Sequence, residues 1–292
     1  MALVVCSIRF KNYQLFLFMN IKYYWINIDK STERRIFMEE QFKLRGIDNQ
    51  RISAITPENL KEIIEDKPPY DCGSPCCIHN NHKDCILEYA CSCSHLKAIK
   101  EGYDSGASYF VVCEDDIYFP FEINFSSMIE KLPKSFGICQ LMVLDEGGNN
   151  YLYDECFKTK DIIFVKFDHS KRLFSTGFYL ISRQGAKQLL DLCINKETNK
   201  FDFRYIEGWK QADYILYCHI NTYTVTLPFC FPFLLFISEI HPNHYPFHKS
   251  AIEKILSIIN EVQYNNPFIT NHYNFEDFYN HYKELLNIKN NN

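Results

Sequence analysis

Short runs rich in aromatic and β-branched residues alternate with amphipathic segments along most of this chain, and this alternation restricts its fold more than any other feature. The expected strands are residues 23–29, 51–55, 109–113, 137–145, 161–167 and 176–182. Segments between them carry apolar residues at helical spacing, as Leu96, Ile99 and Tyr103 do. The pattern predicts an α/β fold: a mixed, mostly parallel sheet with helices on both faces.

The composition indicates a globular protein and argues against a nucleic-acid partner. Of 292 residues, 47% are hydrophobic and 23% are charged, which suits a chain with a large core. The net charge is -5 and the chain has no basic cluster. Because a phosphate backbone is held by grouped Lys and Arg, we expect no nucleic acid to bind.

The sequence divides into three expected parts. Residues 1–21 form an N-terminal extension or strand, residues 22–245 form the main domain, and residues 246–292 form a helical C-terminal extension. The last boundary lies where the strand pattern gives way to helical stripes. Within the main domain, residues 65–93 are expected to form a cysteine-rich insertion.

The sequence gives little evidence of a membrane or secretory signal. No apolar run reaches the roughly 18 to 20 residues that a membrane span needs, and the N-terminus lacks a clean signal cleavage site. We therefore expect a cytoplasmic or peripherally membrane-associated protein. The 13 cysteines leave the lumen of the secretory pathway as the alternative.

Three adjacent carboxylates, Glu114, Asp115 and Asp116, follow the apolar run YFVVC. Ligands of α/β sheets bind beyond the carboxyl ends of strands, which is where these residues fall. In an extended chain Glu114 and Asp116 point to one side, so they could share Mg²⁺ or Mn²⁺, whose charge would offset their repulsion. The alternative is that the carboxylates begin a solvated loop.

Four segments, in order, are similar to motifs of one enzyme family: WINIDKSTER (25–34), CSCSHLKAIKEGYDSGASYFVVCEDDIYF (91–119), STGFYLISRQGAKQLL (175–190) and ADYILY (212–217). On these motifs the chain from Tyr23 to about Ile240 resembles glycosyltransferase family 25. That family includes lipooligosaccharide galactosyltransferases and the collagen hydroxylysine galactosyltransferase domain. The resemblance implies a GT-A type fold, a sugar-nucleotide donor and transfer with inversion of configuration.

The resemblance also implies roles for the acidic motif. In such transferases the diphosphate leaves, and a metal held by carboxylates stabilises its growing charge. Asp116 is the expected direct ligand of Mn²⁺ or Mg²⁺, with Glu114 as a second ligand. Glu114 and Asp115 would orient the ribose, the metal-bound waters or the donor sugar.

Other residues near the ends of strands are candidates for binding the sugar nucleotide. Asn27, Asp29 and Arg34 leave the first strand where a nucleotide would lie, and Arg34 could pair with phosphate. The alternative for Arg34 is a solvent-exposed charge.

Two further candidates lie later in the chain. His95 could contact donor phosphate or sugar, or it could be a buried packing histidine. Thr176 and Gly177, with Ser175, could bring backbone groups close to the donor.

Inverting transfer needs a base that takes the proton of the acceptor hydroxyl. Asp213 is the first candidate and Glu207 the second. The alternative role for Asp213 is that of a helix N-cap.

Two features lie outside the family pattern. The first is the cluster Cys72, Cys76, Cys77, His79, His82, Cys85, Cys91 and Cys93, which could form disulfides, hold a structural zinc ion or remain as free thiols. The second is HPNHYPFH, in which His241 or His244 could complete the metal shell; a proline-rich turn is the alternative.

The function predicted from the sequence is that of an inverting, divalent-metal-dependent hexosyltransferase, with UDP-galactose as the first choice of donor. The expected acceptor is a glycan, a lipid-linked glycan or a protein hydroxyl. One alternative is a UDP-glucose transferase of the same fold. Another is an inactive family member that binds glycans or a partner protein.

Overall fold

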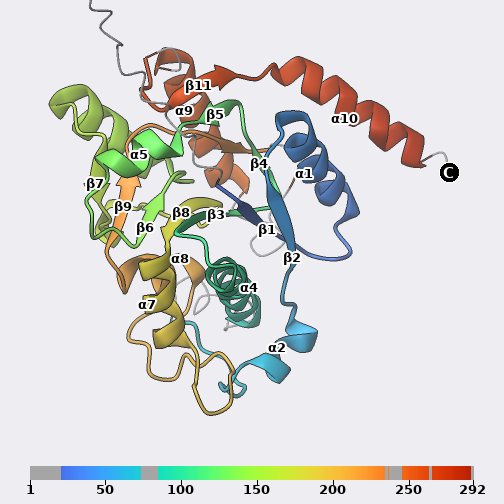
Figure 1. Cartoon of the computed structure of the whole chain (residues 1–292), viewed down its shortest axis with the longest axis vertical. Helices are drawn as coiled ribbons and strands as arrows, with labels where there is room; N and C mark the ends of the chain where they lie inside the picture. Colours follow the sequence, from blue (N-terminus) through green and yellow to red (C-terminus); the bar gives the residue numbers. More distant parts are fainter. Residues whose placement is uncertain (1–20, 74–84, 234–235, 237–244, 263–264, 291–292) are drawn as a thin grey trace, which may run out of the picture.

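The computed structural model describes residues 21–73, 85–233, 236, 245–262 and 265–290 (Figure 1). Its elements are β1 (Tyr23–Asn27), α1 (Thr32–Arg45), β2 (Asn49–Ser53), α2 (Pro57–Ile63), α4 (Cys85–Asp104), β3 (Tyr109–Glu114), β4 (Ile117–Tyr118), β5 (Phe121–Ile123), α5 (Phe125–Lys131), β6 (Ile138–Gln140), α6 (Glu146–Asn150), η1 (Tyr151–Lys158), β7 (Phe164–Lys166), η2 (His169–Lys171), β8 (Phe178–Ser182), α7 (Arg183–Cys193), α8 (Ala212–Cys218), β9 (Thr222–Val225), β10 (Phe231–Pro232), α9 (Tyr245–Val262), β11 (Ile269–His272) and α10 (Phe275–Asn290).

The central sheet has seven strands in the order β2-β1-β3-β8-β6-β9-β7. Strand β1 pairs in parallel with both β2 and β3, and β6 pairs in parallel with β9. Strands β8 and β7 are antiparallel to their neighbours. Five strands (β2, β1, β3, β6 and β9) therefore run in one direction, which confirms the predicted α/β fold with a mixed, mostly parallel sheet.

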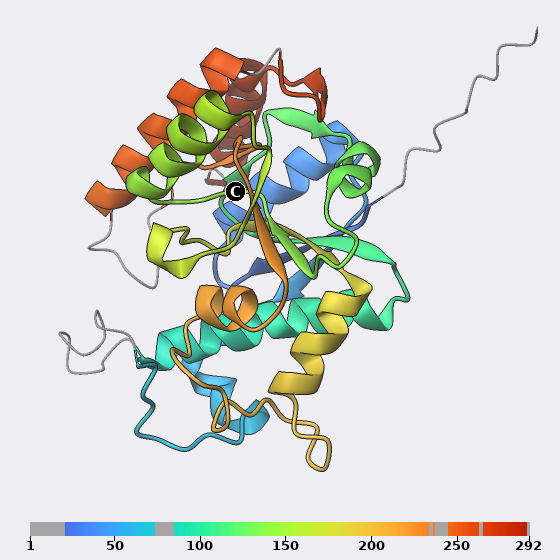
Figure 2. The ribbon, with the colours of Figure 1, turned by 90° about the vertical axis from the view of Figure 1, so that its left-hand side faces the viewer.

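Helices cover both faces of the sheet (Figure 2). Successive side chains of a strand point to opposite faces, and in these strands the side chains on both faces are apolar. In β3, Val111 packs in one core cluster with residues of α1, α5, α9 and α10. The next residue, Val112, packs in a second cluster with residues of α4, α7 and α8. Both faces are thus buried, as the continuous apolar run of β3 predicts.

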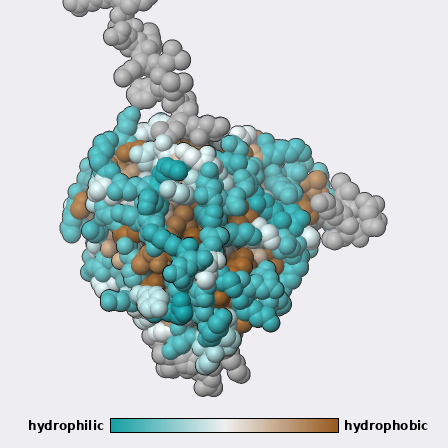
Figure 3. Space-filling model, turned by 60° about the horizontal axis from the view of Figure 1, so that its bottom comes forward, coloured by the Kyte–Doolittle hydropathy of each residue, from teal (hydrophilic) through white to brown (hydrophobic). Residues whose placement is uncertain are grey.

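One face of the molecule is mainly polar. Figure 3, which brings the lower end of the Figure 1 view forward, shows apolar residues only in small, separate areas of that face. Scattered apolar groups of this kind are normal on a folded protein. None of the described helices is long and apolar enough to cross a membrane.

Some predicted strands are shorter in the structure. Of residues 137–145 only β6 (Ile138–Gln140) is a strand of the sheet. The chain then leaves the sheet, and the Asp145 side chain caps α6 by accepting a hydrogen bond from the Gly148 N–H. Of residues 161–167 only β7 (Phe164–Lys166) forms a strand. The predicted strand 51–55 is β2, which begins two residues earlier at Asn49.

The chain beyond residue 245 contains helices α9 and α10, with strand β11 between them pairing with β5. Helix α9 buries Ile255 and Ile259 against the same cluster as α1 and α5. Residues 1–20, which include almost all of the expected N-terminal extension, lie outside the described residues. The domain boundaries given above therefore remain predictions.

Gly185, in the family-like motif ISRQGA, allows α7 to approach the strand next to β8. A Cβ atom at this position would lie 2.5 Å from both Cα and O of Gly137. Ser182 caps the same helix by accepting from the Gly185 N–H at 3.1 Å. The glycine is therefore required by backbone-to-backbone contact.

We predict that Gly185→Ala lowers the free energy of unfolding by about 2 kcal/mol or more, because the obstructing atoms belong to the backbone and must shift. Urea denaturation measures the change. Gln188→Ala, at an exposed position of the same helix, is the control and should change stability by less than about 0.5 kcal/mol. Equal stability of Gly185→Ala and the control would contradict this account of the contact.

Candidate active site

The acidic motif and the end of the first strand meet because β1 and β3 are parallel neighbours. Their register aligns Ile26 with Glu114. Asn27, the last residue of β1, therefore lies beside the carboxylates that end β3. Helix α1 follows β1 after a short turn and brings Arg34, in its first turn, to the same edge of the sheet.

Arg34 and Asn27 supply the partners of two carboxylates. One guanidinium nitrogen of Arg34 lies 2.8 Å from Asp115 Oδ1 and 3.3 Å from Asp116 Oδ2. Asn27 donates from its side-chain amide to Asp115 Oδ2 at 2.7 Å. The Arg34 cation thus offsets part of the repulsion between these carboxylates. From the sequence alone, a bound dication was expected to do this.

Glu114 has a different set of partners. The Thr176 hydroxyl donates to Glu114 Oε1 at 2.9 Å, and His95 Nε2 lies 3.4 Å from the same oxygen. The other ring nitrogen of His95 is 3.1 Å from the Tyr179 hydroxyl. His95 is 1% exposed, so the structure places it as a buried support for Glu114.

The three carboxylates have different acidities. Burial opposes ionisation of Glu114, but the hydrogen bonds from His95 and Thr176 outweigh it and hold its pKa below the usual value. Burial raises the pKa of Asp115, against the opposing effect of Arg34. Burial, together with the charges of Glu114 and Asp115, raises the pKa of Asp116 to about 7. Asp116 is therefore the carboxylate that would gain most from another positive charge.

Asp29 lies at the mouth of the site and is held by β2. Arg51 binds its carboxylate, and the Ser53 hydroxyl donates to Asp29 Oδ2 at 2.9 Å. These bonds keep the pKa of Asp29 below its usual range. Arg51 also donates to Asn27 Oδ1 at 2.9 Å. Arg51 is not among the residues predicted from the sequence, although its place in the strand next to β1 could have indicated it.

Residues 175–177 reach the carboxylates from the antiparallel strand β8. The Glu114 N–H donates to the carbonyl of Gly177 at 3.0 Å. Ser175 has φ of 126°, a conformation that costs free energy in a non-glycine residue. Its carbonyl accepts from the Gln140 amide and from the Tyr217 hydroxyl, both at 3.0 Å. These bonds fix the strained turn beside Glu114.

A cleft of about 630 Å³ extends from the carboxylates across the ends of β1 and β2 to α2 and α4. Its lining includes Asp29, Arg34, His95 and all three residues of the acidic motif. Pockets of roughly 300 to 1,000 Å³ suit ligands of the size of a nucleotide. Asp29, Arg34, His95 and the acidic motif thus share one cleft, whereas Asn27, Thr176 and Gly177, which were also predicted to bind the donor, are not among its lining residues.

The acidic motif suits a hard dication. Glu114 and Asp116 also line a second, smaller pocket that Asp115 does not line, so these two face a common space, as strand alternation predicts. Magnesium sites commonly use one or two carboxylates together with substrate phosphates. In the described part of the chain, no group of three or more His, Cys, Asp or Glu side chains is arranged to hold a metal by itself. The pair therefore fits a metal that binds with a diphosphate.

The two candidate bases are outside the lining of both cavities. Asp213 is in the first turn of α8, and its Oδ1 accepts from the Tyr214 N–H at 2.9 Å. Burial and the neighbouring charge of Glu88 raise its pKa to about 6. Glu207 is exposed in the loop before α8. Neither residue is among the described residues that line the two cavities.

Part of the histidine and cysteine predictions falls outside the described residues. This applies to His241 and His244, and to Cys76, Cys77, His79 and His82. Cys91 and Cys93 lie within α4. The sulfur atoms of Cys72 and Cys85 are 3.3 Å apart, which is longer than the roughly 2.05 Å of a disulfide bond.

A family model described as "Glycosyltransferase family 25 (LPS biosynthesis protein)" matches residues 20–205. The match covers more than half of the chain. The chain therefore belongs to glycosyltransferase family 25 and is a glycosyltransferase, as its motifs predicted. No curated protein is significantly similar to it.

Two solved structures show a weak likeness to the chain. One is a glycosyltransferase involved in the glycosylation of the major capsid of PBCV-1, with 11% identity, a TM-score of 0.29, and coverage of 68% of this chain and 75% of that one. The other is HddC from Yersinia pseudotuberculosis complexed with GMP-PN, with 14% identity, a TM-score of 0.31, and coverage of 80% of this chain and 99% of that one.

We predict that Arg34→Met destabilises the metal-free protein by about 2 kcal/mol near neutral pH, because it leaves two buried carboxylates without their cation. The loss should shrink at about pH 5. There Asp116 is protonated in the folded state, and the missing charge matters less. Thermal unfolding at the two pH values measures the effect.

The control is Arg35→Met. Arg35 is the adjacent residue, and it pairs at 3.9 Å with Asp29, whose side chain is 70% exposed. Its removal should have a smaller effect that varies little between the two pH values. A destabilisation by Arg34→Met that is the same at both pH values would contradict the proposed pairing.

Proposed function

We propose that the protein is an inverting, divalent-metal-dependent hexosyltransferase that uses UDP-galactose as its donor. The observation that carries the proposal is the convergence of the acidic motif and Arg34 at one end of a nucleotide-sized cleft, where the buried Asn27 holds Asp115 in place. Membership of family 25 supplies the reaction class. The choice of galactose and of UDP follows the resemblance set out above.

The metal, Mn²⁺ or Mg²⁺, would be held by Asp116 and Glu114, and when bound it stabilises negative charge on the leaving diphosphate. Asp116 is the first choice of direct ligand because burial and its neighbours raise its pKa to about 7. A dication at this point lowers the cost of ionising it. Glu114 is already ionised and held in place by Thr176 and His95.

Arg34 would change partners when the donor binds. In the protein alone its guanidinium lies between Asp115 and Asp116. If a dication neutralised these carboxylates, the Arg34 guanidinium would be available for bidentate contact with phosphate oxygens. The phosphate role predicted for Arg34 is therefore compatible with its carboxylate contacts.

Asp213 is the proposed base, with Glu207 as the second candidate. A base works best when its pKa is near the working pH, and the pKa of Asp213 is raised to about 6. It lies close enough to Glu114 for the two charges to interact.

The acceptor would be a glycan, a lipid-linked glycan or a protein hydroxyl. A cytoplasmic or peripherally membrane-associated location remains our proposal. For the cysteine-rich segment, disulfides, a structural zinc ion and free thiols remain the three alternatives.

We predict that the protein releases nucleoside diphosphate from one member of a sugar-nucleotide panel in the presence of Mn²⁺, and that Asp116→Asn lowers this rate by about 100-fold or more. Asp104→Asn, an exposed carboxylate at the end of α4, is the control and should keep the wild-type rate.

The panel also separates the alternatives. UDP-glucose as the preferred donor would favour the glucosyltransferase alternative. No release from any donor would favour an inactive, glycan-binding or partner-binding member. Release that is unaffected by Asp116→Asn would contradict the proposed role of the acidic motif.

The pKa of Asp213 predicts a pH profile. Its base function requires the carboxylate form, so kcat/KM should fall as the pH decreases through about 6. In Asp213→Asn this acidic limb should disappear and the rate should fall by about 100-fold. Initial rates between about pH 5 and pH 8 measure both effects. The rates are measured at saturating Mn²⁺, which keeps Asp116 ionised. If the acidic limb still persists in Asp213→Asn, Asp213 is not the group that titrates.

A further inference from the structure

Two cavities meet at the carboxylates Glu114 and Asp116, which line both of them. The large cleft lies on the side of β1, β2 and α4. The small pocket lies on the other side and has a free volume of about 80 Å³. It is too small for a nucleoside diphosphate, which the large cleft accommodates, but it has room for the edge of one sugar ring.

The two cavities differ in which part of the chain builds them. The described residues that line the large cleft all fall between residues 26 and 116, inside the region that the family model matches. Half of the small pocket's lining lies beyond residue 205, where the match ends: Pro232, Phe233, Phe236, Tyr245, His248, Lys249 and Ile252. The large cleft is therefore built entirely from the matched region, whereas the small pocket combines residues of that region with the segment beyond residue 205.

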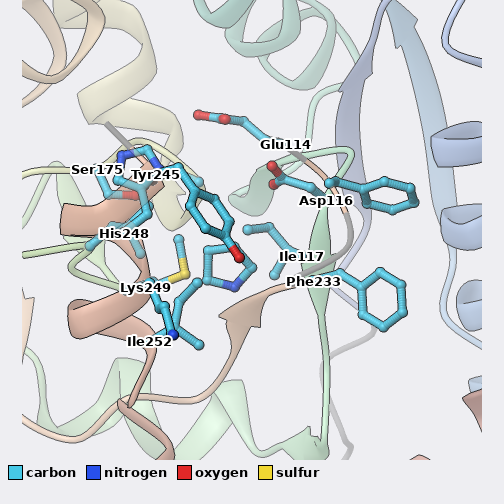
Figure 4. A pocket seen from close by; sticks show the side chains of 14 residues that line it. Glu114, Asp116, Ile117, Ser175, Phe233, Tyr245, His248, Lys249 and Ile252 are labelled. Carbon is cyan, nitrogen blue, oxygen red and sulfur yellow. Dashed lines mark hydrogen bonds between the residues drawn. The ribbon is translucent and has the colours of Figure 1, made fainter. Parts of the chain in front are cut away.

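Helix α9 forms the far wall of the small pocket (Figure 4). Tyr245, His248, Lys249 and Ile252 are three, four and seven residues apart, so they share one face of the helix. The Tyr245 hydroxyl points into the pocket, and His248 and Ser175 both line it. Tyr245 remains 43% exposed, although large aromatic residues are usually buried. An aromatic ring left open beside reactive carboxylates is available to a ligand.

The lining combines apolar and polar groups as a sugar requires. Met142, Leu144 and Phe233 are apolar, while Tyr245 and His248 can donate or accept hydrogen bonds. A pyranose ring presents an apolar C–H face, which suits an aromatic wall, and hydroxyl groups at its edge. The carboxylates of Glu114 and Asp116, at one end of the pocket, can accept hydrogen bonds from such hydroxyl groups.

We propose that the small pocket binds the terminal sugar of a glycan acceptor, and that Tyr245 and His248 determine which sugar is accepted. The inference rests on the proposed glycosyltransferase function and adds the acceptor class to it. In this arrangement the donor and the acceptor sugar approach Glu114 and Asp116 from opposite sides. Because Asp213 interacts with Glu114 but lines neither cavity, the reacting hydroxyl has to lie on the Glu114 side of the acceptor sugar.

The test measures binding, so it does not depend on turnover. The probes are 4-nitrophenyl glycosides of galactose, glucose, mannose and N-acetylglucosamine, added to the full chain with UDP and Mg²⁺, which is diamagnetic and leaves the NMR signals sharp. Saturation-transfer NMR detects the bound sugar, and titration gives its Kd. We expect at least one glycoside to bind, and both Tyr245→Ala and His248→Ala to weaken it by about 10-fold, the equivalent of about 1.4 kcal/mol.

The matched control is Phe247→Ala. Phe247 is an aromatic residue in the same helical turn, is 67% exposed and is not among the residues that line the pocket. This variant should bind the glycoside as the wild type does. The Kd for UDP should stay within about twofold in all three variants, because the large cleft is intact. Circular dichroism confirms that each variant is folded.

Three results would overturn the inference: no glycoside binds to the wild type, Phe247→Ala weakens binding as much as Tyr245→Ala does, or the α9 variants weaken UDP and leave the glycoside unaffected. The last result would assign the pocket to the donor. Failure of the proposed function is a separate outcome: glycoside binding depends on Tyr245, yet no sugar nucleotide in the panel is turned over.

Discussion

The site depends on how the protein accommodates three adjacent carboxylates at the end of a buried strand. Two unit charges about 4 Å apart repel by roughly 4 kcal/mol at an effective dielectric constant of 20. The protein reduces this cost with a cation and with hydrogen bonds: Arg34 lies between Asp115 and Asp116, and Asn27 donates to Asp115. Both partners come from β1 and the helix after it, so the parallel pairing of β1 with β3 is a condition for the site to exist.

The same arrangement makes neighbouring carboxylates chemically different. Hydrogen bonds from Thr176 and His95 favour the ionised form of Glu114, whereas Asp116 has a pKa raised to about 7. Two groups whose surroundings push their pKa values apart can take different roles in one reaction. Glu114 is a fixed negative charge before any ligand arrives. Asp116 ionises most readily when a further cation binds beside it.

Much of the fold could be predicted from the sequence, because strand alternation and helix periodicity are local properties. The α/β class, the position of β3 and the helix after Ser182 follow from such patterns. Contacts between distant segments could not be predicted in this way. The Arg51 bonds to Asn27 and Asp29 depend on strand register, and the approach of Tyr245 to the carboxylates depends on how α9 packs over the sheet.

The antiparallel strand β8 explains why two motifs some sixty residues apart belong to one site. In a purely parallel sheet, the strand next to β3 would end where β3 ends, and its first residues would lie at the opposite edge. Because β8 runs the other way, with Cys113 opposite Phe178, the residues that precede it meet the end of β3. Thr176 can therefore bond to Glu114, and the strained Ser175 lines the small pocket. The reversal of a single strand thus places the segment STG between the large cleft and the pocket under α9.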